Sequence, residues 1–337
     1  MTMRVVYLEE KMEAKIGIIT DSINFPSLPA MKISAYHKSL GDNVEFVTNF
    51  FEKYDKVYIS KVFNLDLPTI NQINYIPQAD EIIYGGSGYA IEIVNGKEIY
   101  HKELDIALPK EIENQFPDYN LYGNQFKDIA YGFLTRGCPN NCDFCVVAKK
   151  EGLCSHKVAD LNNFWCGQKQ IKLLDPNILA CKDREDLIKQ LIYSKAEIDY
   201  TQGLDARLID DDIAALISKT KIKMIHFAFD LMKNEEKILN GLKIFSKFYQ
   251  KDNRHKRVYI LTNYNTTLQE DYYRVKKVIE LGYSPYVMIY RKGTHPQFLT
   301  DLSRWSNNMF LLRSTSFEDY IPRKDNKRCK ELYKGII

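Results

Sequence analysis

The sequence lacks any hydrophobic run long enough to cross a membrane. Within its 337 residues, no stretch approaches the ~20 consecutive apolar residues that a membrane-spanning helix needs. The first fifteen residues carry several acidic side chains and no apolar core of a secretory signal. We therefore expect a cytoplasmic protein with no membrane partner.

Cysteine is scarce, and none occurs before Cys138. The seven cysteines are an odd number in a long chain, which argues for reduced thiols rather than a disulfide framework. An excess of one charge sign is also lacking, because the formal net charge is only +3. Such a small charge neither requires nor excludes a nucleic-acid partner.

Short apolar segments alternate with a helical pattern in the first part of the chain. Strands are expected over 15–20, 44–47, 56–60 and 81–84, and a helix over 28–40 that ends at Gly41. This alternation predicts a parallel sheet, and we interpret residues 1–90 as a small doubly wound α/β domain. Residues 91–127, with the hairpin signal Asn95-Gly96, are expected to be a connector.

Six strand–helix units are expected after residue 128. Their strands are predicted over 129–134, 171–175, 198–202, 224–229, 257–262 and 286–290. The helix after the second strand is expected to begin near Asp183, whose side chain can cap it. Repeated units of this kind with right-handed crossovers close toward a barrel, so residues 128–292 are predicted to form a partial (β/α)6 barrel. Residues 293–337 are expected to cap its open side, with Trp305 and Tyr290 either lining a pocket or packing in the core.

Three thiols lie close together directly after the first of these six strands. Cys138, Cys142 and Cys145 have the spacing C-x3-C-x2-C, and Gly137 and Pro139 favour a loop that brings the sulfurs together. Clustered thiolates bind iron–sulfur clusters or zinc. Three local ligands suggest a cluster with one iron left open, and the alternative is a structural zinc site with Cys154 as fourth ligand.

The segment from Thr135 to Cys145 resembles the radical S-adenosylmethionine (SAM) superfamily, in which three cysteines at this spacing hold a [4Fe–4S] cluster. Phe144 fits the resemblance, because an aromatic residue commonly precedes the third cysteine there. The resemblance implies that Cys138, Cys142 and Cys145 are metal ligands and that the open iron binds SAM. It further implies reductive cleavage of SAM to a 5′-deoxyadenosyl radical, which activates a C–H bond of a substrate.

Polar residues follow five successive predicted strands, and such strand ends carry the working residues of barrel folds. The resemblance assigns Arg207 to the SAM carboxylate, and Gln202 and Asp230 to SAM or its ribose. Asp175 and Asn177 stand where many members have Gly-Gly-Glu to hold the SAM ammonium, although that motif is absent here. Phe144 completes the predicted cofactor-binding set, and Asp205 has the simpler alternative role of orienting Arg207.

Residues 1–90 resemble the cobalamin-binding-type domain that precedes many radical SAM barrels. Members that bind cobalamin through a histidine carry Asp-x-His-x-x-Gly after the first strand. This chain has Asp21-Ser22-Ile23-Asn24-Phe25-Pro26 there, so cobalamin is not expected. The Gly-rich segment from Gly85 to Gly88 lacks the third glycine of a dinucleotide fingerprint and is interpreted as a tight turn.

Two functions of different classes remain open at this stage. The first is a radical SAM enzyme served by an electron donor such as flavodoxin or ferredoxin, with a nucleic acid, peptide or small molecule as substrate. The second is a zinc-stabilised module that binds nucleic acid or protein without redox chemistry. The remaining cysteines, Cys154, Cys166, Cys181 and Cys329, are expected to be buried thiols rather than ligands of a second cluster.

Overall fold

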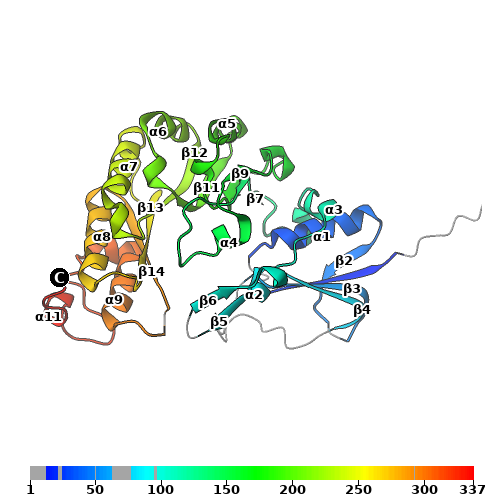
Figure 1. Cartoon of the computed structure of the whole chain (residues 1–337), viewed down its shortest axis with the longest axis horizontal. Helices are drawn as coiled ribbons and strands as arrows, with labels where there is room; N and C mark the ends of the chain where they lie inside the picture. Colours follow the sequence, from blue (N-terminus) through cyan, green and yellow to red (C-terminus); the bar gives the residue numbers. More distant parts are fainter. Residues whose placement is uncertain (1–12, 22–24, 50, 63–76, 95–96, 292) are drawn as a thin grey trace, which may run out of the picture. The chain divides into compact units, whose positions relative to one another are not determined.

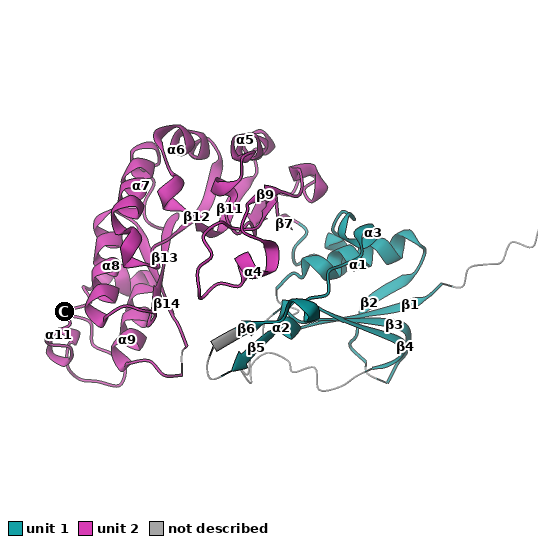
Figure 2. Ribbon diagram, viewed as in Figure 1, with its two compact units in different colours: residues 1–127 teal, residues 128–337 magenta. Residues whose placement is uncertain are grey.

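The computed structural model describes residues 13–21, 25–49, 51–62, 77–94, 97–291 and 293–337. The chain forms two compact units, residues 1–127 and residues 128–337 (Figure 2). Within the described residues, no helix combines the length and the apolar character needed to span a membrane.

Unit 1 is built on a four-stranded parallel sheet with the order β2-β1-β3-β4. Its strands are β1 (Lys15–Thr20), β2 (Asn43–Phe46), β3 (Lys53–Ser60) and β4 (Gln78–Gly85). Helix α1 (Leu28–Ser39) joins β1 to β2, and it begins where the Ser27 side chain accepts a hydrogen bond from the Ala30 amide. The apolar side chains of β1 and α1 share one core cluster, which includes Ile16, Ile18 and Ile33.

The segment expected to be a connector carries structure of its own within unit 1. Short helix α2 (Ser87–Ala90) leads into an antiparallel hairpin of β5 (Ile91–Val94) and β6 (Lys97–Tyr100). Its predicted turn, Asn95-Gly96, lies outside the described residues. Helix α3 (Lys110–Glu113) contacts α1, and the Tyr122 hydroxyl accepts a hydrogen bond of 2.8 Å from the Ser27 amide. Helix α3 and the turn at Tyr119–Tyr122 are thus packed against α1.

Unit 2 contains a six-stranded parallel sheet with the order β14-β13-β12-β11-β10-β7, so each strand lies beside its predecessor (Figure 1). The strands are β7 (Ile129–Gly132), β10 (Gln170–Leu173), β11 (Glu197–Leu204), β12 (Lys221–Ala228), β13 (Lys256–Thr262) and β14 (Ser284–Ile289). The predicted α/β class with parallel sheets is confirmed.

Helices cover one face of this sheet. They are α5 (Arg184–Ser194), α6 (Asp211–Ser218), α7 (Glu235–Phe248) and α8 (Leu268–Glu280). Phe227 of β12 is fully buried against Phe245 of α7, with ring centroids 5.2 Å apart. Because side chains alternate along a strand, His226 and Ala228 point to the opposite face.

Side chains cap the starts of α6 and α8 but not that of α5. Thr267 and Glu270 form a capping box at α8, and Asp210 accepts from the Ile213 amide at α6. Asp183 was expected to cap α5, but its side chain makes no capping hydrogen bond. That expectation is wrong, because Asp183 has a ψ of 10° instead of the extended backbone of a capping residue.

The C-terminal residues continue unit 2 with α9 (Gln297–Ser306), α10 (Met309–Ser314) and α11 (Cys329–Leu332). Helix α9 packs against β14. Trp305 on α9 is buried and contacts Phe317, and its indole N–H donates to the Thr315 carbonyl at 2.9 Å. Of the two roles considered for Trp305, the structure therefore shows core packing.

Candidate functional site

The loop with the three clustered cysteines starts from a buried carboxylate clamp. Asp175, just after β10, is almost fully buried and accepts hydrogen bonds from the amides of Leu134 and Thr135, at 3.1 and 2.5 Å, and from the Thr135 hydroxyl at 2.7 Å. Burial raises the pKa of Asp175 to about 6, although these donors favour the ionised form. Asp175 thus fixes the chain just before the cysteines. Its carboxylate, which the resemblance assigned to SAM binding, is engaged by these hydrogen bonds.

A second carboxylate closes the other side of the loop. Glu151, at the end of α4 (Val147–Glu151), accepts from the Arg136 guanidinium at 2.7 Å and from the Gly137 amide at 3.0 Å. Gly137 has a φ of 82°, and a Cβ placed on it would lie 2.2 Å from the Cys154 carbonyl oxygen. Only glycine therefore fits this position, and the loop folds back tightly on residues 151–154.

The three thiols lie near enough to influence one another. Burial, followed by the neighbouring Cys145 and Cys138, raises the pKa of Cys142 to about 11. Burial also raises the pKa of Cys145. The described residues contain no group of three His, Cys, Asp or Glu side chains in a preformed metal-binding arrangement. Thiolates are the ligand form, so any metal bound here must displace protons from these thiols.

Asn177 connects the cysteine loop to the end of β10. Its side chain is buried, its Nδ2 lies 3.7 Å from the Cys138 sulfur, and its Oδ1 has no hydrogen-bond partner. A buried amide oxygen without a partner costs about 1–3 kcal/mol, which a ligand with an N–H or O–H group would recover. The sulfur donor set and this unpaired oxygen together fit a cluster with a polar ligand beside it.

Arg207 is held in place by the acid two residues before it. Its Nε and Nη2 donate to the two Asp205 oxygens at 2.8 and 2.6 Å, and Asp205 also accepts from the Asn140 side chain at 3.0 Å. Asp205 therefore orients Arg207, which is the simpler role considered for it from the sequence. Through Asn140 it also links Arg207 to the cysteine loop. The nearby Cys142 and Cys138 add to Asp205 in raising the pKa of Arg207.

A cavity of about 590 Å³ lies at the carboxyl ends of the strands of unit 2, within the range of roughly 300–1,000 Å³ typical of ligand sites. Its lining includes five of the predicted site residues, namely Cys142, Phe144, Asn177, Arg207 and Asp230. The other four predicted site residues, Cys138, Cys145, Asp175 and Gln202, are not among the residues that line it. A neighbouring cavity of about 710 Å³ shares four of these lining residues, namely Asn140, Asp205, Arg207 and Asn234.

Gln202 lies on a bulged part of β11. Four residue steps on β11, from Tyr200 to Leu204, oppose two steps on β12, from Ile225 to Phe227. The Tyr259 hydroxyl donates to the Thr201 carbonyl at 2.9 Å in this irregular stretch. Bulges re-aim side chains next to sites, and here Gln202 is exposed while Gly203 lines the cavity.

Asp230 is positioned by Arg274, which was not among the residues predicted from the sequence. The Oδ1 atom of Asp230 accepts a hydrogen bond from the Leu261 amide at 3.0 Å, and burial raises the pKa of Asp230 to about 6. The fully buried Arg274 donates to the backbone oxygens of Phe229, Asp230 and Leu261, and pairs with the equally buried Asp271 at 2.5 Å. Asp271 and Arg274 lie three residues apart on the core-facing side of α8 with Val275 and Val278, which is the pattern that could have identified them.

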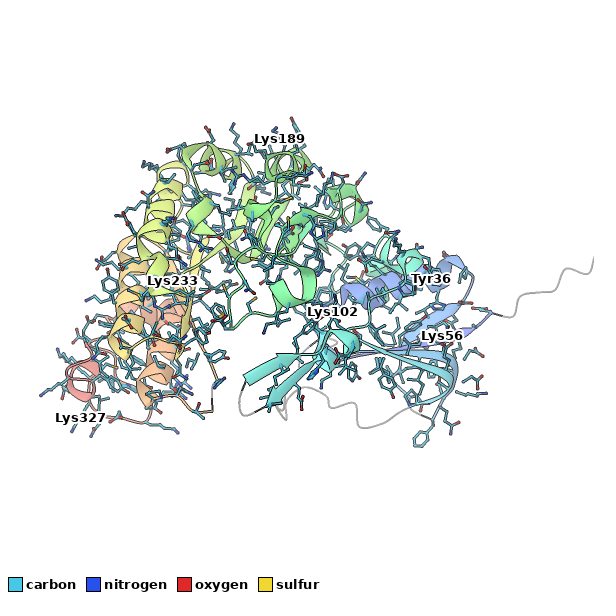
Figure 3. The ribbon with its side chains drawn as sticks, in the orientation of Figure 1. Tyr36, Lys56, Lys102, Lys189, Lys233 and Lys327 are labelled. Carbon is cyan, nitrogen blue, oxygen red and sulfur yellow. The ribbon has the colours of Figure 1, made fainter. Side chains whose placement is uncertain are left out.

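Aromatic and basic residues complete the cavity lining. Phe144 meets Tyr264 edge to face at a centroid distance of 5.1 Å, and Tyr264 meets Tyr290 in the same way at 4.9 Å. Lys233, labelled in Figure 3, comes from the segment Met232–Asn234 between β12 and α7 and lines the same cavity. Tyr264 and Lys233 follow strand ends, where polar residues were expected, but neither was singled out by the sequence.

The four cysteines outside the loop differ from one another in solvent exposure. Cys181 and Cys329 are buried, as expected for thiols that act as small hydrophobic groups. Cys154 and Cys166 are exposed instead, so the expectation of burial is wrong for these two. Cys154 lies between α4 and the short strand His156–Lys157, and Cys166 lies between the helical turn Leu161–Asn163 and β10.

A comparison with protein-family models gives no match. A search among curated proteins likewise finds no relative.

Proposed function

We propose that this chain is a radical SAM enzyme, with Cys138, Cys142 and Cys145 as ligands of a [4Fe–4S] cluster. The observation that carries the proposal is the shared cavity, in which Cys142 and Phe144 of the cysteine loop meet Asn177, Arg207 and Asp230 from three strand ends. When bound, the cluster supplies the electron that cleaves SAM to methionine and a 5′-deoxyadenosyl radical, which takes a hydrogen atom from a substrate.

The order of the strands supports the same proposal. Six parallel strands follow one another across one sheet, and helices cover one of its faces. This arrangement agrees with a partial (β/α)6 barrel of the radical SAM type, in which the working residues gather at the carboxyl ends of the strands.

The cavity residues have distinct tasks in this proposal. Arg207, preset by Asp205, offers its remaining N–H groups to the SAM carboxylate. Asp230 has one carboxylate oxygen engaged by the Leu261 amide, and the other accepts from the ribose hydroxyls or the ammonium. The unpaired Asn177 Oδ1 accepts a hydrogen bond from the ligand next to Cys138.

Anaerobic reconstitution with iron and sulfide tests the proposal. We expect a brown protein that releases 5′-deoxyadenosine from SAM after reduction by dithionite or by a flavodoxin or ferredoxin. Cys142→Ala should lose both the colour and the release. Cys166→Ala, which removes an exposed thiol of the same unit, should keep both.

The zinc-stabilised binding module gives the opposite result in the same preparation. A colourless protein that retains one zinc per chain and releases no 5′-deoxyadenosine would overturn the enzyme proposal. Cleavage of SAM by the Cys142→Ala variant would refute the ligand assignment alone.

A further inference from the structure

A row of charged and aromatic side chains crosses the sheet of unit 2 on the face opposite the helices. The members of this inner row lie on neighbouring strands: Lys172 pairs in register with Tyr131 and Asp199, His226 with Arg257, and Tyr259 with Tyr286. None of them belongs to the lining of the cavity described above. The row therefore needs an explanation separate from SAM binding.

The members of the inner row contact one another closely. Lys172 lies over the Tyr131 ring at 5.8 Å, and Arg257 lies over the Tyr286 ring at 5.2 Å. His226 stacks on Tyr259 with a centroid distance of 4.8 Å and an interplanar angle of 8°. Rings thus hold both cations in place from one side.

Positive charge in the inner row exceeds negative charge. Lys172 has Asp199 at 4.0 Å as its carboxylate partner, whereas no carboxylate of the described residues lies within ion-pairing distance of Arg257. His226 is neutral near pH 7, because burial lowers its pKa to about 4. The inner row therefore has two cations, Lys172 and Arg257, and one carboxylate, Asp199. A partly buried guanidinium that lacks an anionic partner favours binding of an anion from a ligand.

Asp199 adds a second unmet requirement. Its Oδ1 is buried and has no hydrogen-bond partner, and the nearest charged or titratable nitrogen, Nδ1 of His226, is 3.9 Å away. That nitrogen is already engaged with the Tyr200 carbonyl at 2.8 Å. A ligand with a hydroxyl or amino group would satisfy Asp199.

The inner row continues directly into the cavity along the same face. His226 is followed at alternate positions by Ala228, the last residue of β12, and by Asp230 just beyond the strand, and both line the cavity. Two residues of a strand span about 7 Å, so His226 lies about 7 Å along the strand from Ala228 at the edge of the cavity. On β11, a Cβ placed on the cavity-lining Gly203 would lie 3.4 Å from Tyr259.

We propose that the inner row binds the substrate through an oxyanion group held by Arg257, with Asp199 accepting a hydrogen bond from a hydroxyl or amino group of the same molecule. The substrate class is thus a phosphate or carboxylate compound with a neighbouring hydrogen-bond donor. That this ligand is the substrate rests on the proposed function, whereas the oxyanion site itself does not.

Binding of simple probes to the full chain without cluster or SAM tests the site. Glycerol 3-phosphate and glycerate present the two oxyanions with hydroxyl groups, and methyl phosphate presents the anion without them. Ligand-detected NMR titration gives the dissociation constants. We expect at least one of the two hydroxylated probes to bind, and Arg257→Gln to weaken its binding at least tenfold. If the preferred probe is glycerol 3-phosphate, methyl phosphate should bind less tightly, because it has no hydroxyl group for Asp199.

Arg254→Gln is the matched control, because Arg254 is an exposed arginine near the start of the same strand whose guanidinium already pairs with Asp252. It should leave binding unchanged, and thermal melting should show that both variants remain folded. Absence of binding by both hydroxylated probes, or equal binding to wild type and Arg257→Gln, would overturn the proposal. A protein that binds the probe but holds no iron would instead count against the proposed function alone.

Discussion

Replacement of Asp175 by alanine separates the clamp seen in the structure from the SAM-binding role that the resemblance implied. The substitution leaves the buried amides of Leu134 and Thr135 without an acceptor. Each unsatisfied amide costs about 1–3 kcal/mol, so the free energy of unfolding of unit 2 should fall by about 2–6 kcal/mol. This loss is a large part of the 5–15 kcal/mol typical of a folded domain.

Urea unfolding followed by tryptophan fluorescence measures this effect in unit 2 alone, because both tryptophans of the chain, Trp165 and Trp305, lie there. Iron content after reconstitution should also decrease, since the chain leading into Cys138 loses its anchor. The control is Asp186→Ala, which breaks an exposed pair with Lys189 and should cost less than about 1 kcal/mol.

If Asp175→Ala kept the stability and iron content of the wild type and lost only SAM affinity, the carboxylate would be a SAM ligand and not a clamp. Calorimetric titration of SAM into the reconstituted variant distinguishes these outcomes.

Three further predictions concern the rest of unit 2. Arg207→Ala should weaken SAM binding at least tenfold in calorimetry with unchanged iron content, and unchanged affinity would remove Arg207 from the site. His226 has its native pKa lowered from 6.5 to about 4, so the unfolded state binds more protons between these values and stability is lost as the pH falls from about 6.5 to 4. Urea unfolding should show the difference between wild type and His226→Gln changing by about 3 kcal/mol over that window, and a pH-independent difference would contradict the burial argument. Arg274→Met should lower the unfolding free energy by about 3–5 kcal/mol, because it leaves the fully buried Asp271 charge unpaired, and a loss below 1 kcal/mol in the same assay would refute this.

Much of the local structure could be predicted because its signals lie within a few residues. The apolar segment at Lys15–Thr20 and the helix that begins at Leu28 both appear as predicted. The capping box of Thr267 and Glu270 is another signal that spans only four residues. These features depend on backbone preference and periodicity, which the tertiary structure leaves unchanged here.

The candidate site was only partly predictable, because strand ends do not reveal where each side chain points. Asn177, Arg207 and Asp230 line one cavity as the pattern of polar strand ends suggested. Gln202 does not line it, since the bulge of β11 re-aims that stretch. Asp175 lies beneath the loop because its carboxylate is the acceptor nearest to two amides forty residues away in sequence.

The sequence by itself determined the α/β class, the positions of the main strands along the chain and the spacing of Cys138, Cys142 and Cys145. These are properties of neighbouring residues, and neither register nor packing alters them. Only the tertiary structure decided that Arg274 supports Asp230, that Asp205 presets Arg207, and that an unbalanced positive row lies below the cavity. Such roles depend on which buried polar groups and charges find a partner, and the partners come from distant segments that folding brings together.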